Sequence, residues 1–119
     1  MPKAYFLDLG LRNFFKGDFG LYESREDKGA LLENALLRQL LESYDKDEIR
    51  FWRTIAQKEV DFVAEEKTAY EAKASLKNIK TKDYRLFTEA YPAIKLNFAS
   101  FDCQQNEVGG FEAVNLWEV

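Results

Sequence analysis

The chain has 119 residues, of which 46% are hydrophobic, and this length and apolar content suit one domain with one packed core. Its 17 basic and 21 acidic residues give a net charge of −4, which excludes a general attraction to a phosphate backbone and leaves nucleic-acid binding to a local basic patch. The absence of His excludes the Ser-His-Asp and Cys-His catalytic groups and most catalytic zinc sites, so chemistry must use carboxylate, Lys, Tyr or hydroxyl groups.

Apolar periodicity and turn residues predict a single α/β domain over residues 1–119. In chain order, the predicted elements are a strand-like or irregular segment at 3–9, a short helix or turn at 9–15, a polar loop at 16–29, a helix at 29–44, strands at 48–54, 58–64 and 68–74, a helix at 78–91, a strand at 93–100 and a last strand at 111–119. Short links between the three central strands favour antiparallel pairing. Together the elements predict a central mixed sheet of about four to five strands flanked by helices.

The setting of the chain is indicated by three features. A β-like pattern begins almost at the first residue, which indicates a domain cut from a longer protein. The lone Cys103 cannot form an internal disulfide, which suits a reducing compartment. No apolar run of membrane length occurs. We therefore expect a cytoplasmic domain with no membrane partner.

Glu33 lies within the apolar side of the predicted helix at 29–44. At about 100° per residue, Leu32, Leu36 and Leu40 span about 0° to 80°, and Glu33 falls beside them at about 100°. An ionised carboxylate there is costly unless it is paired, hydrogen-bonded or bound to a cation, so its position predicts a partner. The alternative is a wet edge of the stripe, where Glu33 caps a backbone group or meets an Arg.

Charged residues alternate along two neighbouring predicted strands. Glu59 and Asp61 share a face of the second strand. Glu71 and Lys73 share a face of the third. Because these strands are adjacent in the chain, we expect the two faces to meet with the first helix nearby. The alternative is two solvated faces with cross-strand ion pairs such as Asp61 with Lys73, each contributing less than about 1 kcal/mol.

A helix acid, a strand acid and an acid-x-Lys strand together predict a divalent metal site. Glu33, Asp61 and Glu71 are the predicted ligands of Mg²⁺ or Mn²⁺, because hard divalent cations prefer oxygen ligands. Asp61, Glu71 and Lys73 are the predicted catalytic residues. The metal would polarise a phosphate and help to form hydroxide, and Lys73 would orient the water or stabilise developing charge. Chemistry of this kind needs no His.

Several strings also carry a resemblance to a known family. They are YFLDLGL at 5–11, GALLEN at 29–34, FWRT at 51–54, EVDFV at 59–63 and YEAKAS at 70–75. In these strings, and over nearly its whole length, the chain resembles the uncharacterised C-terminal domain that follows an AAA+ ATPase module in many bacterial and archaeal predicted ATPases. The resemblance implies an AAA+ ATPase module as partner within a longer chain. No G-x-x-x-x-G-K-[ST] motif occurs, so we expect no ATP hydrolysis by these residues alone.

That family domain is in turn similar to the restriction-endonuclease-like PD-(D/E)xK nuclease superfamily. The superfamily's helix acid, strand Asp and (D/E)xK correspond to Glu33, Asp61, and Glu71 with Lys73. Val60 stands where the superfamily has Pro before the Asp, which is a mild departure. The resemblance implies a restriction-endonuclease-like core and a metal-dependent activity on DNA phosphodiesters.

Other residues suggest contacts to nucleic acid. Arg53 could reach a phosphate or neutralise the acids, and Lys77 and Lys80 belong to the densest basic stretch, which could follow a DNA backbone. A solvated helix face is the alternative for the lysines. Phe51 and Trp52 should point to opposite faces of their strand, where packing in the core is the favoured interpretation over stacking on a base.

Three functional hypotheses remain open at this point. The first is a metal-dependent nuclease-like domain acting on DNA. The second is a non-catalytic accessory module that uses the same fold to bind nucleic acid, a protein partner or its own ATPase. The third is a structural dimerisation domain.

Overall fold

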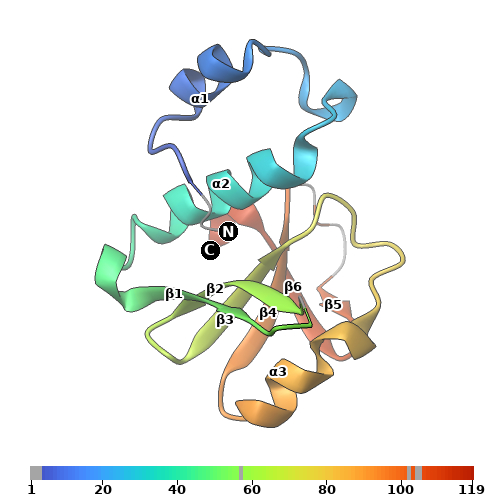
Figure 1. Cartoon of the computed structure of the whole chain (residues 1–119). Helices are drawn as coiled ribbons and strands as arrows, with labels where there is room; N and C mark the ends of the chain where they lie inside the picture. Colours follow the sequence, from blue (N-terminus) through green and yellow to red (C-terminus); the bar gives the residue numbers. More distant parts are fainter. Residues whose placement is uncertain (1–3, 57, 102, 104–105) are drawn as a thin grey trace.

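The computed structural model describes residues 4–56, 58–101, 103 and 106–119, and over these residues a six-stranded sheet lies between helices (Figure 1). The strands are β1 (Ile49–Arg53), β2 (Glu59–Ala64), β3 (Thr68–Ala72), β4 (Lys95–Ser100), β5 (Glu107–Val108) and β6 (Phe111–Asn115). Their order across the sheet is β1-β2-β3-β4-β6-β5. β1, β2 and β3 pair antiparallel as predicted, β3–β4 and β4–β6 pair parallel, and β5–β6 pair antiparallel. The α/β class with a mixed sheet is therefore confirmed.

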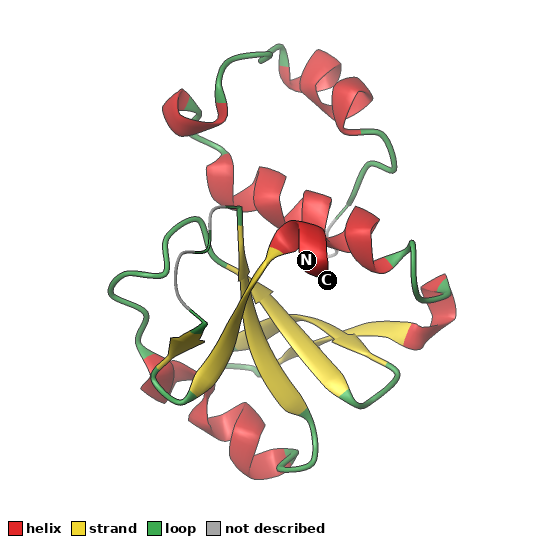
Figure 2. Ribbon diagram, turned by 180° about the vertical axis from the view of Figure 1, so that it is seen from behind, coloured by secondary structure: helices red, strands yellow, loops and turns green. Residues whose placement is uncertain are grey.

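Helices cover both faces of this sheet. The helical elements are α1 (Leu9–Lys16), η1 (Tyr22–Ser24), α2 (Lys28–Leu40), η2 (Lys46–Glu48), η3 (Thr81–Tyr84), α3 (Arg85–Ala90) and η4 (Leu116–Glu118). Figure 2 shows α2 and the C-terminal η4 on one side of the sheet and α3 on the other. Over the described ranges, none of the helices has both the length and the hydropathy that crossing a bilayer requires.

The hydrophobic core has two layers, one on each face of the sheet. Leu32, Leu36 and Leu40 of α2 pack with Phe62 and Leu116 on the first face. On the second face, Tyr84 of η3 and Phe87 of α3 pack with strand residues, which include Val60, Val63, Ala69, Leu96 and Phe98. The leucines recur every four residues, so one side of α2 is apolar and is buried against the sheet.

An N-terminal lobe, residues 8–27, lies on the outer side of α2 (Figure 1). Its centre is an ion-pair cluster in which Arg25 binds both carboxylate oxygens of Asp27, at 2.8 and 2.9 Å. Arg12 donates to the same carboxylate at 2.8 Å, and Arg25 also donates to the Asn13 side chain at 2.8 Å. Because Arg12 and Arg25 are both buried, Asp27 neutralises charge that would otherwise destabilise the lobe.

The structure corrects several predicted element boundaries. The helix predicted at 29–44 ends at Leu40. After it, the amides of Glu42 and Ser43 donate to the carbonyl groups three residues earlier, as in a 3₁₀ turn. The helix predicted at 78–91 is shorter, η3 followed by α3, because Asn78 has a left-handed φ of 60° that a helix cannot accommodate. That helix ends before Pro92, as expected.

The number of strands is also different from the prediction. The sheet has six strands instead of four to five, because the pair Glu107–Val108 forms a hairpin with β6 across Gly109 and Gly110. Both glycines have positive φ, 55° and 89°, as a two-residue hairpin turn requires. The β-like pattern near the N-terminus forms no strand over residues 4–8. Instead, the Asn34 side chain binds the amide and the carbonyl of Phe6, at 2.9 and 2.7 Å, and takes the place of a strand partner.

Candidate active site

The predicted acids meet where β2 and β3 separate. The last backbone pair between the two strands is Phe62 with Tyr70. The next residues, Asp61 and Glu71, do not form a ladder pair. There the Asp61 amide donates to the Glu71 carboxylate at 3.1 Å. In return, the Ala72 amide donates to the Asp61 carboxylate at 2.8 Å. Two side chains therefore replace the backbone bonds that the ladder lacks, as buried amides require.

A β-bulge turns Asp61 toward α2. Arg50 pairs with Val63 and Trp52 pairs with Val60, so one residue of β1 stands opposite two residues of β2. The extra residue reverses the alternation of β2, which places Val60 and Val63 in the same core layer and Phe62 in the other. Simple alternation along a strand cannot predict this shift.

Burial and neighbouring charge act together on Asp61. Its side chain is almost fully buried, and burial, the charge and hydrogen bonding of Glu71, and the charge of Glu33 raise its carboxyl pKa to about 9, against an ordinary value of 3.8. The hydrogen bond from the Ala72 amide lowers the pKa of Asp61, but its effect is smaller. The buried Asp61–Glu71 pair therefore holds a proton to higher pH than an exposed carboxyl group would, and positive charge entering the site would oppose this.

Glu33 reaches this site from α2. Its carboxylate accepts a hydrogen bond from the Tyr5 hydroxyl at 2.8 Å. The pKa of Tyr5 is raised by burial first and then by Glu33, with smaller contributions from Asp61 and Glu59. The helix acid thus has a hydrogen-bond partner, as its position in the apolar stripe predicted, and it lies within electrostatic reach of Asp61.

Glu71 and Lys73 share Tyr84 as a neighbour. Tyr84 is 6% exposed, and its pKa is raised by burial and then by the charge of Glu71 and hydrogen bonding to it. The Lys73 amine lies 5.6 Å from the centre of the Tyr84 ring, within range of a cation–π contact. Glu71 therefore extends to the α3 side of the sheet, whereas Asp61 lies near α2, and the two meet through the opening between their strands.

The structure places the predicted nucleic-acid residues apart from one another. Arg53 pairs with Glu59 across β1 and β2, with Nη2 3.1 Å from Oε2. Lys77 and Lys80 are exposed on the segment between β3 and η3. The prediction of core packing for Trp52 is confirmed, because its ring packs edge-on against the ring of Phe87, with the ring centroids 5.3 Å apart. The prediction of core packing for Phe51 is wrong, since it is 72% exposed.

The three acids are of the ligand type that a divalent cation prefers, but their side chains are not arranged around a common metal position. In the part of the chain that the structure describes, no three Asp, Glu or Cys side chains are arranged to hold a metal ion. The donor set nevertheless consists of hard carboxylate oxygens, which Mg²⁺ and Mn²⁺ prefer. The charges of Glu71 on β3 and Glu33 on α2 both raise the pKa of the buried Asp61 carboxyl group, and a cation there would relieve that repulsion.

The sequence matches one known family. Residues 28–117 match the family described as Domain of unknown function (DUF4143). The chain belongs to this family. All four residues of the predicted metal and catalytic set lie within the matched part of the DUF4143 domain, whereas Tyr5 and the N-terminal lobe precede it. Comparison with curated proteins and with solved structures gave no match.

Three residues of the DUF4143 site were not singled out from the sequence. Tyr5 binds Glu33, Asn34 holds the segment that carries Tyr5, and Tyr84 lies against Glu71 and Lys73. Asn34 follows Glu33 directly within a run of Ala and Leu at residues 30–37. A buried polar side chain needs partners, and this is a signal that could have found Asn34. Tyr5 and Tyr84 come from distant parts of the chain, so no local spacing indicates them.

Proposed function

We propose that this DUF4143 domain is a metal-dependent hydrolase of DNA phosphodiesters, with Asp61 and Glu71 at its acidic centre and Lys73 beside the attacking water. One observation carries the proposal: Asp61 and Glu71 bind each other's strands where the ladder stops, and Lys73 lies against the same phenol as Glu71. The resemblance to the PD-(D/E)xK superfamily, with its restriction-endonuclease-like core, supports the same chemistry. An N-terminal AAA+ ATPase module is the proposed partner within a longer chain.

The proposed metal ligands are Glu33, Asp61 and Glu71. The charges of Glu71 and Glu33 raise the cost of ionising Asp61, and Mg²⁺ or Mn²⁺ would lower it. When bound, the ion would polarise the phosphate and lower the pKa of a water molecule. Because the acids come from α2, β2 and β3, the packing of the helix on the sheet determines how well the three can converge.

Lys73 and the surface cations have separate proposed roles. The Lys73 amine, held near the Tyr84 ring, stabilises negative charge that develops on the phosphate and orients the water. Arg53, Lys77 and Lys80 contact the DNA backbone outside the site. The overall charge is −4, so these local cations would position the DNA.

A non-catalytic accessory domain is the second candidate, and one observation favours it. Each acid of the central pair already accepts a hydrogen bond from a backbone amide. The pair therefore satisfies buried amides where β2 and β3 separate, whether or not a metal binds. On this alternative the domain binds nucleic acid, a protein or its ATPase through the same fold without cleaving DNA.

The experiment is a cleavage assay on the purified chain. Supercoiled plasmid, duplex DNA and single-stranded DNA are incubated with Mg²⁺ or Mn²⁺ and the variants Asp61→Asn, Glu71→Gln and Lys73→Ala. We expect each variant to lose at least about 100-fold in rate, whereas Lys77→Ala, the matched control for Lys73, weakens DNA binding and leaves the chemical step intact. Cleavage of no DNA form with either metal would reject the catalytic proposal. DNA binding without metal that Asp61→Asn leaves unchanged would then favour the accessory domain.

A further inference from the structure

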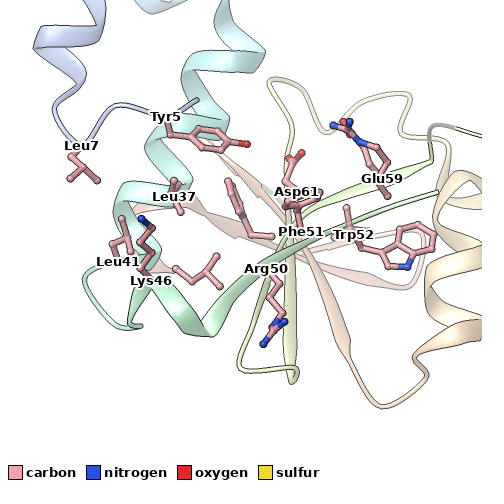
Figure 3. Close-up of a pocket in the computed structure, with 14 residues that line it drawn as sticks. Tyr5, Leu7, Leu37, Leu41, Lys46, Arg50, Phe51, Trp52, Glu59 and Asp61 are labelled. Carbon is pink, nitrogen blue, oxygen red and sulfur yellow. The ribbon is translucent and has the colours of Figure 1, made fainter. Parts of the chain in front are cut away.

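A pocket of about 560 Å³ opens beside Asp61, on the α2 side of the sheet (Figure 3). The N-terminal segment contributes Tyr5, α2 contributes Leu37, β1 contributes Phe51 and β2 contributes Asp61 and Phe62. Figure 3 shows the Tyr5 hydroxyl and the Asp61 carboxylate directed toward one another, with Trp52 and Arg50 turned away. The volume falls within the range of small-molecule and cofactor sites.

The chemistry changes from one end of the pocket to the other. At one end are Asp61 and the ion pair of Arg53 with Glu59. Aromatic and aliphatic side chains line the middle, and Phe51 leaves most of its ring free, with 72% of the residue exposed. Lys46 lines the opposite end. A planar apolar group fits the aromatic middle of the pocket, and a phosphate that follows it fits the cationic end at Lys46.

We propose that this pocket is a nucleobase subsite for single-stranded DNA, in which a base next to the scissile phosphate stacks on Phe51. The inference rests on the proposed function, because it places the scissile phosphate at Asp61. A base stacked on an aromatic ring next to a cation is a general mode of single-strand binding. Lys46 then meets the following phosphate.

The occupied pocket determines the form of the substrate. A base in a duplex is stacked and paired, and it must leave the helix before it can enter a pocket between α2 and the sheet. Single-stranded DNA and locally unpaired DNA do not have this cost. The domain therefore prefers single-stranded or unpaired DNA over a perfect duplex of the same sequence.

The test measures binding with EDTA present, so that cleavage and metal binding play no part. A single-stranded oligonucleotide carrying 2-aminopurine reports stacking by its fluorescence, and anisotropy of a labelled oligonucleotide reports affinity. We expect Phe51→Ala to weaken binding about 5- to 100-fold and to remove the change in 2-aminopurine fluorescence. Phe51→Trp should keep both. Phe19→Ala is the matched control, because Phe19 is 70% exposed on the N-terminal lobe.

The remaining outcomes separate this inference from the proposed hydrolysis. Weakened binding by Phe51→Ala without any metal-dependent cleavage would support the subsite and reject the catalytic function. Equal binding by wild type, Phe51→Ala and Phe19→Ala would overturn the subsite even if Asp61 proves catalytic. It would also be overturned if duplex DNA bound more tightly than the single strand, or if an abasic oligonucleotide bound as tightly as the intact one.

Discussion

The Asp61 amide lies 3.1 Å from the Glu71 carboxylate, in the opening where β2 and β3 cease to pair. This bond holds the two acids together in a buried place, where the charge of Glu71 opposes the ionisation of Asp61. The same feature that stabilises the strand ends thus creates a group that is costly to charge. The first two predictions concern this cost.

Asp61→Asn should stabilise the fold while it removes the proposed activity. Asn is neutral at every pH and keeps an oxygen for the Ala72 amide, so the variant avoids the cost of ionisation. We expect the free energy of unfolding at pH 8 to rise by more than about 1 kcal/mol, measured by urea denaturation. Asp47→Asn, an exposed control, should change it by less than about 0.5 kcal/mol.

The pH dependence of the free energy of unfolding is an independent test of whether ionising Asp61 destabilises the fold. Its folded pKa of about 9 lies above the ordinary 3.8, so the folded state binds the proton more strongly. Stability from this group is therefore present below the ordinary pKa and declines as pH rises toward 9. Wild-type stability should fall over this window more steeply than that of Asp61→Asn. Parallel curves for the two proteins would contradict the raised pKa.

A divalent metal ion should restore the stability that the fold loses as pH rises. If Glu33, Asp61 and Glu71 take up Mn²⁺ or Mg²⁺, binding to the folded state alone raises the melting temperature as metal concentration rises. The rise should be larger at pH 8 than at pH 6, because metal competes with the proton on Asp61. Glu71→Gln should show little shift, and Ca²⁺ offers a comparison with a larger ion. A rise of equal size in wild type and Glu71→Gln would place the metal elsewhere.

Tyr84 should act as a positioning residue for Glu71 and Lys73. Tyr84→Phe removes the hydroxyl near Glu71 and keeps the ring beneath the Lys73 amine, whereas Tyr84→Leu removes both. We expect the rate of DNA cleavage to fall about 10- to 100-fold in Tyr84→Phe, with DNA affinity unchanged, and further in Tyr84→Leu. A purely structural role would instead lower the melting temperature of both variants while leaving kcat intact in the folded fraction.

Asp27 should hold the N-terminal lobe in a pH-dependent way. Hydrogen bonding to Arg25 and Arg12 lowers the pKa of Asp27 well below its ordinary 3.8. Its stabilisation is therefore complete above the ordinary value and is lost as pH falls through the lower folded value. Asp27→Asn should lower the melting temperature at pH 7 by several degrees and speed amide exchange in α1. The gap between the two proteins should narrow in acid.

Gly109 and Gly110 offer a matched pair for the β5–β6 turn. Both have positive φ, so an Ala at either position is strained. At Gly109 the added methyl group would also overlap the side chain of Thr81 in η3, whereas at Gly110 it meets open space. Gly109→Ala should therefore lower the free energy of unfolding by about 1–3 kcal/mol and Gly110→Ala by less, as measured by urea denaturation. Equal effects would indicate that Thr81 moves aside.

The sequence by itself determined the class of the fold and the residue types of the site. The four-residue spacing of Leu32, Leu36 and Leu40 predicts α2, and the short turns predict three antiparallel strands, because both patterns depend on neighbouring residues alone. The same local patterns identified Glu33, Asp61, Glu71 and Lys73 as unusual charges.

Only the tertiary structure decided how those charges meet. The bulge at Asp61, the separation of β2 from β3, and the approach of Tyr5 and Tyr84 depend on contacts between segments that are distant along the chain. The exposure of Phe51 and the pocket beside it also follow from how α2 packs against the sheet. Such contacts form when whole helices and strands bury apolar surface against one another. The local periodicity of the sequence does not specify the register in which these elements pack.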